Sequence, residues 1–144
     1  MFFEDLQVGA TFVSRGRTIT ETDVVMFAAL SGDYSEIHTN AEAARQAPAG
    51  ARIAHGALIF SISLGLTTQL AIVDESLIAL HGIEGMRFTK PVFIGDTIHV
   101  QKRVTAADDK GNGRGIVSFD TRTINQHGAM VLRFRDSLVL KTRG

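Results

Sequence analysis

The chain has 144 residues, no cysteine, and 15 basic side chains balanced by 15 acidic ones, so its formal net charge is zero. That length predicts a single domain over residues 1–144. Neutrality argues against a nucleic-acid partner, because proteins that bind nucleic acids usually carry a basic face. It also means that no large charge repulsion opposes self-association. The missing cysteines exclude thiol nucleophiles, disulfides and cysteine-based metal sites.

The amino-terminus and one long apolar stretch indicate where in the cell the protein is expected. Residues 1–6 carry two acids where a signal peptide would carry basic residues. Residues 53–73 lack acidic and basic side chains but contain hydroxyl groups, a glutamine and a histidine. This mixture favours a helix buried in protein over one buried in lipid. We therefore expect a soluble, cytoplasmic protein without a membrane partner.

The first half of the chain predicts a short strand followed by helices. Residues 11–19 are partly alternating and predict a first strand. Thr20 opens an approximate capping box, and Gly32 is placed to end the helix that begins there. Asn40 can cap a second short helix. Residues 56–72 form the longest apolar segment and predict a helix. Such a helix must be covered by protein on most sides, and a curved sheet is the simplest way to cover it.

The second half of the chain predicts that sheet. Alternating or β-branched patterns predict strands over four ranges, which are 86–92, 97–105, 115–124 and 129–141. Turn signals lie within a few residues of each strand, so antiparallel pairing is expected. The glycine-rich run at 111–115 superficially suggests a phosphate loop, but its context favours a hairpin turn. Sheet and helices together predict one α+β domain.

Polar chemistry concentrates at residues 31–38, which read Ser-Gly-Asp-Tyr-Ser-Glu-Ile-His. This segment sets a carboxylate, Asp33, and an imidazole, His38, five residues apart just past the end of a helix. Gly56 then opens the apolar helix, where unpaired N–H groups and the positive end of the helix dipole attract an anion. A base, an acid and an anion-binding backbone group are the parts needed to add water across a polarised double bond.

On these residues the chain resembles the MaoC-like acyl dehydratases, or (R)-specific enoyl-CoA hydratases, whose signature runs S-G-D-x-N-P-aliphatic-H. Further matching segments follow in family order at residues 4–9, 18–21, 53–56 and 90–96. The resemblance covers nearly the whole chain and implies a hot-dog fold, a long helix wrapped by a curved antiparallel sheet. It implies reversible hydration of a trans-2-enoyl-CoA to an (R)-3-hydroxyacyl-CoA. Coenzyme A then enters only as part of the substrate, without another cofactor.

The resemblance also assigns roles to three residues. Asp33 and His38 would activate the attacking water and move a proton on one face of the double bond, and the Gly56 N–H would receive the thioester oxygen. The chain departs from the signature at Ser35 and Glu36, where asparagine and proline are usual. Because a serine side chain is shorter than asparagine, we expect its hydroxyl to reach the same partner only through water.

Six other side chains are candidates with a less specific pattern. His55 can orient the loop at the helix entrance, and Tyr34 is a candidate to line the pocket. Ser61 can contact substrate, although a bond from its hydroxyl to the preceding turn of helix is favoured. Arg87, Lys90 and Lys102 can meet coenzyme A phosphates, although solvated surface charge is favoured for all three. No metal site is expected, because neither H-x-x-x-H nor H-E-x-x-H occurs.

Two other functions are compatible with the same expected fold. Hot-dog thioesterases often carry a catalytic carboxylate on the central helix, and residues 56–73 contain none. A module that binds acyl-CoA without turning it over is favoured only by the departure from the signature.

A single sheet leaves one side of the helix poorly covered, so we expect a homo-oligomer in which two subunits join their sheets edge to edge. The sequence leaves open the acyl group, and whether Gly56 serves its own chain's Asp33 or a neighbour's.

Overall fold

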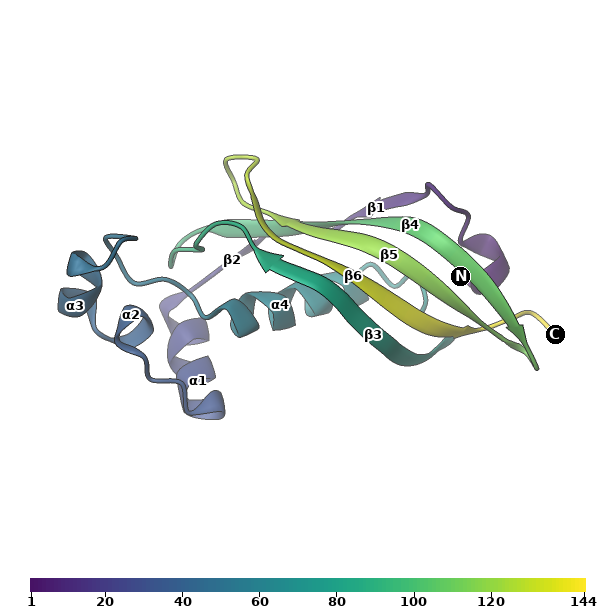
Figure 1. The fold of residues 1–144 in the computed structure, drawn as a ribbon, viewed down its shortest axis with the longest axis horizontal. Coiled ribbons are helices and arrows are strands. Elements are labelled where there is room, and N and C mark those ends of the chain that lie inside the picture. Colours follow the sequence, from purple (N-terminus) through teal and green to yellow (C-terminus); the bar gives the residue numbers. More distant parts are fainter.

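The computed structural model describes residues 1–144 as one antiparallel sheet, a helix packed against it and a helical segment at one end (Figure 1). The elements in chain order are η1 (Phe3–Asp5), β1 (Thr11–Val13), β2 (Arg17–Thr18), α1 (Glu21–Ser31), α2 (Glu36–Thr39), α3 (Ala41–Gln46), α4 (Gly56–Thr68), β3 (Leu77–Phe88), β4 (Thr97–Gly111), β5 (Arg114–Ile124) and β6 (Met130–Lys141). The strand order is β1-β4-β5-β6-β3, and β2 pairs with the start of β4. The expected α+β architecture is confirmed.

The long strands form where apolar side chains recur at every second position. In β4, the side chains at positions 98, 100, 102 and 104 are all buried, and these positions share one face of the sheet. Asn112 and Gly113 close the β4–β5 hairpin with positive φ angles of 54° and 75°. Two residues with positive φ are typical of a tight hairpin turn, so the hairpin interpretation of the glycine-rich run is confirmed.

Two strands are longer than the sequence pattern predicts. β3 begins at Leu77 rather than at residue 86, and β4 continues to Gly111 rather than ending at 105. Three register shifts interrupt the pairing of β3 with β6, and most of its side chains are exposed. Such shifts remove the strict alternation on which a strand prediction depends. The first predicted strand is instead divided into β1 and β2, with the Ser14 hydroxyl accepting the Val100 N–H between them at 2.8 Å.

The predicted helices are present, and their ends follow from capping. At the start of α1 the Thr20 hydroxyl accepts the Asp23 N–H, and the Asp23 carboxylate accepts the Thr20 N–H in return. The Asn40 side chain likewise caps α3. α4 ends four residues early, because the chain tightens after Thr68 and Ala71 adopts a φ of 53°. α2, a single short turn, is absent from the sequence prediction.

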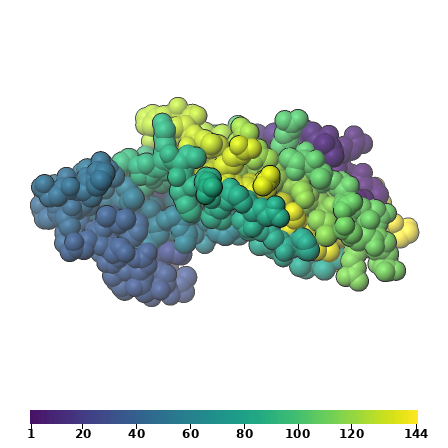
Figure 2. Space-filling view, in the orientation of Figure 1, coloured from purple at the N-terminus to yellow at the C-terminus, as the bar shows by residue number.

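The main core lies between α4 and the sheet, where Ile59, Ile62 and Leu66 pack against Val100 and Phe134, among others. Helices α1 to α3 project beyond one end of the sheet, where Figure 2 shows them as the blue lobe. This places the segment between α1 and α2 beside the amino-terminal end of α4. No helix combines the length and the apolar character that crossing a bilayer requires.

Candidate active site

Asp33 and His38 lie together where α1, α2 and the start of α4 meet. Gly32 ends α1 in a left-handed conformation with a φ of 77°, which turns the chain away from the helix. α2 then places His38 so that its Nε2 lies 3.9 Å from the Asp33 Oδ2. This separation is too long for a direct hydrogen bond, but it allows one water molecule to bond to both atoms.

The backbone fixes the orientation of the His38 ring, which is buried. Its Nδ1 lies 2.7 Å from the carbonyl oxygen of Ile53. Because a carbonyl oxygen only accepts, Nδ1 must donate, and in the neutral ring Nε2 therefore carries the free lone pair. That lone pair belongs to the nitrogen beside Asp33, so His38 is prepared to accept a proton from water. Arg52 supports this arrangement by donating to the His38 carbonyl at 3.3 Å and to Glu21 at the start of α1.

Ser35 bonds directly to Asp33, so the expected contact through water is wrong. The Ser35 hydroxyl donates to the Asp33 Oδ1 at 2.5 Å, and the Ser35 N–H donates to the same oxygen at 3.1 Å. The loop turns tightly enough for a short hydroxyl to suffice. These bonds, the side-chain bond first, hold the pKa of Asp33 below its usual value. The carboxylate is therefore ionised at neutral pH, and its other oxygen is the one beside His38.

His55 lies against His38 and links it to the Asp33 loop. It is the residue before α4 and is buried. Its Nε2 lies 2.9 Å from the Asp33 carbonyl oxygen and must donate to it. Its ring stacks on His38 with centroids 3.9 Å apart, while Nδ1 is buried without a partner. These contacts agree with the loop-orienting role expected from its position at the helix entrance.

Asp33, His38 and His55 also form a cluster that the sequence spacing did not indicate. Their potential ligand atoms lie within 4.8 Å of one another, a grouping able to hold a metal ion. The two imidazole rings, however, are stacked with an angle of only 28° between their planes, so their lone pairs lie in nearly parallel planes, which is unlike the tetrahedral arrangement of zinc ligands. To share an ion, one ring would have to turn and lose its hydrogen bond to the backbone.

Gly56 supplies an unpaired backbone donor to the same site. As the first residue of α4, it has an N–H without a partner inside the helix. Gly56 and His38 both line a cavity of about 480 Å³, whose walls include Ile59 and Phe88. A Cβ at position 56 would lie 3.0 Å from the Phe88 ring, so glycine leaves this wall open to a ligand.

The remaining candidates lie elsewhere. Tyr34 is 61% exposed and does not line the cavity. The Ser61 hydroxyl donates to the Ala57 carbonyl at 2.8 Å, which confirms the favoured interpretation. Lys102 is not a solvated surface charge, because its side chain is buried and paired with Asp136. The site thus holds a proton acceptor, His38, and the unpaired N–H of Gly56 at one cavity, with the Asp33 carboxylate 3.9 Å from His38. Together these groups can activate water and stabilise an oxyanion.

Comparison with known proteins agrees with this geometry. The family described as "MaoC like domain" matches residues 5–127. "Protein MaoC" of Klebsiella aerogenes is 38% identical over an alignment of 132 positions that covers 83% of this chain and 39% of that protein. The chain therefore spans well under half of that relative. The (R)-specific enoyl-CoA hydratase of Rhodospirillum rubrum is 32% identical over an alignment of 144 positions that covers 99% of this chain and 94% of that protein.

Solved structures show the same fold. The X-ray structure of a monoamine oxidase regulatory protein from Archaeoglobus fulgius superposes with a TM-score of 0.94 at 36% identity, covering 100% of this chain and 96% of that one. A protein of Mycobacterium tuberculosis described as a double hotdog fold superposes with a TM-score of 0.83 at 22% identity, covering 99% of this chain and 44% of that one. The expected hot-dog fold is therefore confirmed.

Proposed function

Because this chain belongs to the MaoC-like domain family, we propose that it is a lyase that reversibly hydrates a trans-2-enoyl-CoA to the (R)-3-hydroxyacyl-CoA. The observation that carries the proposal is the arrangement of His38 and Asp33, 3.9 Å apart beside the Gly56 cavity. The Rhodospirillum hydratase, which aligns over nearly the whole chain, has this activity by name. Coenzyme A enters as part of the substrate, and the reaction needs no further cofactor.

In the proposed reaction a water molecule lies between the Asp33 carboxylate and the His38 Nε2. The pair takes a proton from the water as its oxygen bonds to the β-carbon of the enoyl group. The electrons of the double bond move toward the thioester oxygen, which accepts the Gly56 N–H as it gains negative charge. The proton held by the pair then passes to the α-carbon. The pair lies on one side of the substrate, so oxygen and proton add to the same face.

The direct test is an assay of the purified chain with trans-2-enoyl-CoA thioesters of several lengths, including branched and carboxylated ones. Loss of the enoyl thioester absorbance without release of free thiol is expected. Thiol release would instead identify a thioesterase, although α4 carries no acidic side chain. Calorimetric binding without either reaction would identify a binding module, and both outcomes contradict the proposal.

Ser35→Ala is expected to raise the pKa of Asp33. The variant loses the side-chain hydrogen bond that contributes most to lowering this pKa. A pH titration of the Asp33 carboxyl carbon by NMR measures the change directly, whereas the acid limb of kcat/KM also depends on the protonation of His38. Ser35→Thr retains a hydroxyl and is the control. A titration midpoint that is the same in Ser35→Ala and in the parent chain would contradict the effect of the hydroxyl.

We also propose that two copies pair through β3. This strand is the free edge of the sheet, 12 residues long. Its apolar side chains Leu77, Ile78 and Leu80 are each about half exposed. A long apolar edge strand is a template for pairing with another chain, and an identical edge satisfies it by an antiparallel contact.

Ile78→Lys is expected to shift the protein from dimer to monomer in size-exclusion chromatography with light scattering. The substitution buries an unpaired ammonium group at the proposed contact. Val8→Lys, at another exposed β-branched side chain in the loop after η1, is the control and should leave the dimer intact. A monomeric parent chain, or a dimer that tolerates Ile78→Lys, would contradict pairing through β3.

A further inference from the structure

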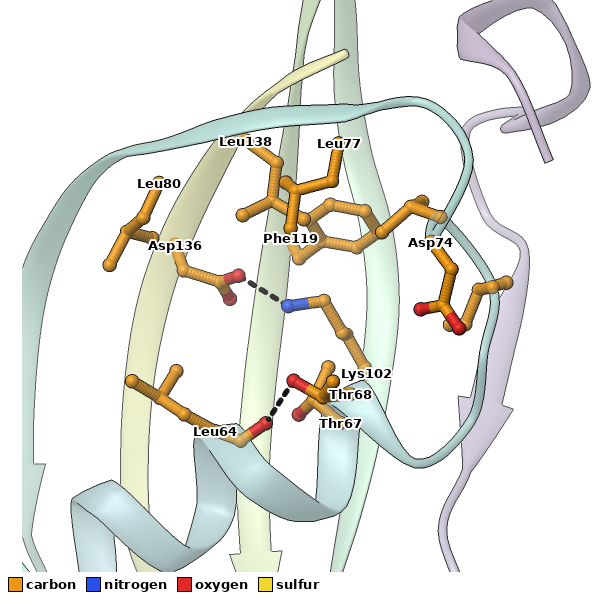
Figure 3. Close-up of a pocket in the computed structure, with 12 residues that line it drawn as sticks. Leu64, Thr67, Thr68, Asp74, Leu77, Leu80, Lys102, Phe119, Asp136 and Leu138 are labelled. Carbon is orange, nitrogen blue, oxygen red and sulfur yellow. Dashed lines mark hydrogen bonds and ion pairs between the residues drawn. The ribbon is translucent and has the colours of Figure 1, made fainter.

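A second cavity, of about 180 Å³, lies at the other end of α4 from Gly56. Its walls are mostly apolar side chains from α4, the β3 edge and the sheet, among them Leu64, Leu77 and Leu138 (Figure 3). Within these walls lie Lys102 of β4 and Asp136 of β6, only 2% and 1% exposed. Figure 3 shows the ammonium and carboxylate groups facing each other in the middle of the cavity. The proposed hydration uses neither group.

This buried pair retains hydrogen-bonding capacity. Lys102 has three N–H donors, and Asp136 is its one hydrogen-bond acceptor in the structure, with the Phe119 ring 4.2 Å away. Asp136 accepts from Lys102 through Oδ2 and from the Thr121 hydroxyl through Oδ1 at 2.6 Å, which uses about two of roughly four lone-pair sites. A donor and an acceptor are thus both available to a ligand in an otherwise apolar cavity.

The charge of the cavity selects among polar ligands. The ammonium of Lys102 is already balanced by Asp136, and Asp74 adds a further carboxylate to the wall. A ligand carboxylate would therefore enter a site with no free positive charge, at the cost of its own desolvation. A hydroxyl group is uncharged, accepts from Lys102 and donates to Asp136. Because it satisfies both groups without adding charge, a hydroxyl is the best complement to the pair.

The two cavities lie in succession along the same elements. The first is bordered by Gly56 of α4 and Phe88 of β3, and the second by Leu64 of α4 and Leu80 of β3. Between them on α4, Phe60 packs edge-on against Phe134 of β6 with centroids 5.1 Å apart. Eight residues of helix separate Gly56 from Leu64, which is about 12 Å. This aromatic pair separates the two cavities, so an acyl chain that follows α4 from Gly56 must displace it to reach Lys102 and Asp136.

We propose that the substrates of this enzyme are enoyl-CoA thioesters whose acyl chain carries a hydroxyl group at its far end, which binds between Lys102 and Asp136. The inference rests on the proposed hydration of enoyl-CoA and names the substrate class of that site. The thioester binds at Gly56, the chain follows α4, and the terminal hydroxyl replaces hydrogen bonds to water with bonds to the buried pair.

The test compares three series of trans-2-enoyl-CoA thioesters with matched chain lengths, ending in a methyl, a hydroxyl or a carboxylate group. At the length that spans both cavities, kcat/KM for the hydroxyl series should exceed that for the methyl series by about 10- to 100-fold, as expected of hydrogen bonds to charged groups. The carboxylate series should fall below the hydroxyl series. Shorter chains should show no preference.

The double variant Lys102→Met/Asp136→Leu should abolish the preference for the hydroxyl series. The matched control is Lys110→Met/Asp108→Leu, which removes an exposed lysine–aspartate pair and should retain the preference. Hydration of all series without a preference, or a preference that survives the double variant, would overturn the inference and leave the proposed function standing. The absence of hydration in every series would instead contradict the proposed function itself.

Discussion

Asp33→Asn and His38→Gln should each lower kcat/KM for enoyl-CoA hydration by about 10²- to 10⁴-fold, the range that a positioned acid or base contributes. Asparagine keeps an oxygen that can accept from Ser35, so the loop stays in place while the negative charge is lost. Glutamine removes the Nε2 lone pair beside the water. Both groups act on one water molecule, so the double variant should lose little more activity than either single variant.

Two comparisons distinguish loss of chemistry from loss of structure in these variants. His127→Gln changes an exposed histidine in the turn between β5 and β6, and it should retain full activity. Circular dichroism and thermal unfolding should be nearly unchanged for Asp33→Asn, because the Asp33 side chain is 46% exposed. A loss of activity smaller than about 10-fold in either single variant would remove that residue from the proposed catalytic pair.

The sequence predicts the elements of the site better than it predicts their contacts. The end of α1 at Gly32 and the start of α4 at Gly56 are set by local rules, namely a left-handed C-cap and an apolar run. The role of Asp33 and His38, in contrast, comes from the family signature, because a five-residue spacing alone does not bring two side chains together. The short α2 that does so has no periodic pattern long enough to detect.

The contacts that orient His38 depend on tertiary structure. Its ring is fixed by the Ile53 carbonyl, 15 residues away, and stacked on His55, 17 positions further along the chain. No local pattern encodes a backbone carbonyl as a partner, so such a bond could not be predicted. For Ser35, comparison with the longer asparagine suggested a contact through water, but the conformation of the loop brings the hydroxyl within direct reach of Asp33.

The burial of Lys102, in contrast, could have been predicted from its position in the sequence, although its charge suggested a surface residue. It lies in phase with Ile98, Val100 and Val104 on the buried face of β4. Asp136 is likewise in phase with Phe134 on β6. A charged residue at an inward position of a strand is rarely buried without a partner, so two such residues of opposite sign on one sheet predict a buried pair. The inward position of Lys102 in the alternation of β4 therefore predicts its burial better than its charge does.

Lys102→Met is expected to lower the free energy of unfolding by about 3–5 kcal/mol, the usual cost of removing one partner of a buried ion pair. The Asp136 carboxylate would remain 1% exposed, with the Thr121 hydroxyl as its one remaining side-chain donor. Urea unfolding, followed by circular dichroism, measures this loss. The same substitution at Lys110, whose partner Asp108 is exposed, should cost less than about 1 kcal/mol.

The double variant Lys102→Met/Asp136→Leu should recover most of that stability, because apolar residues of similar volume fill the site without the desolvation of two charges. A double variant no more stable than Lys102→Met alone would show that apolar side chains cannot replace the pair and that folding depends on it. Recovery of stability together with loss of the hydroxyl preference would have a different meaning. The chain would then retain a buried ion pair that folding does not require, because the pair recognises the end of the acyl chain.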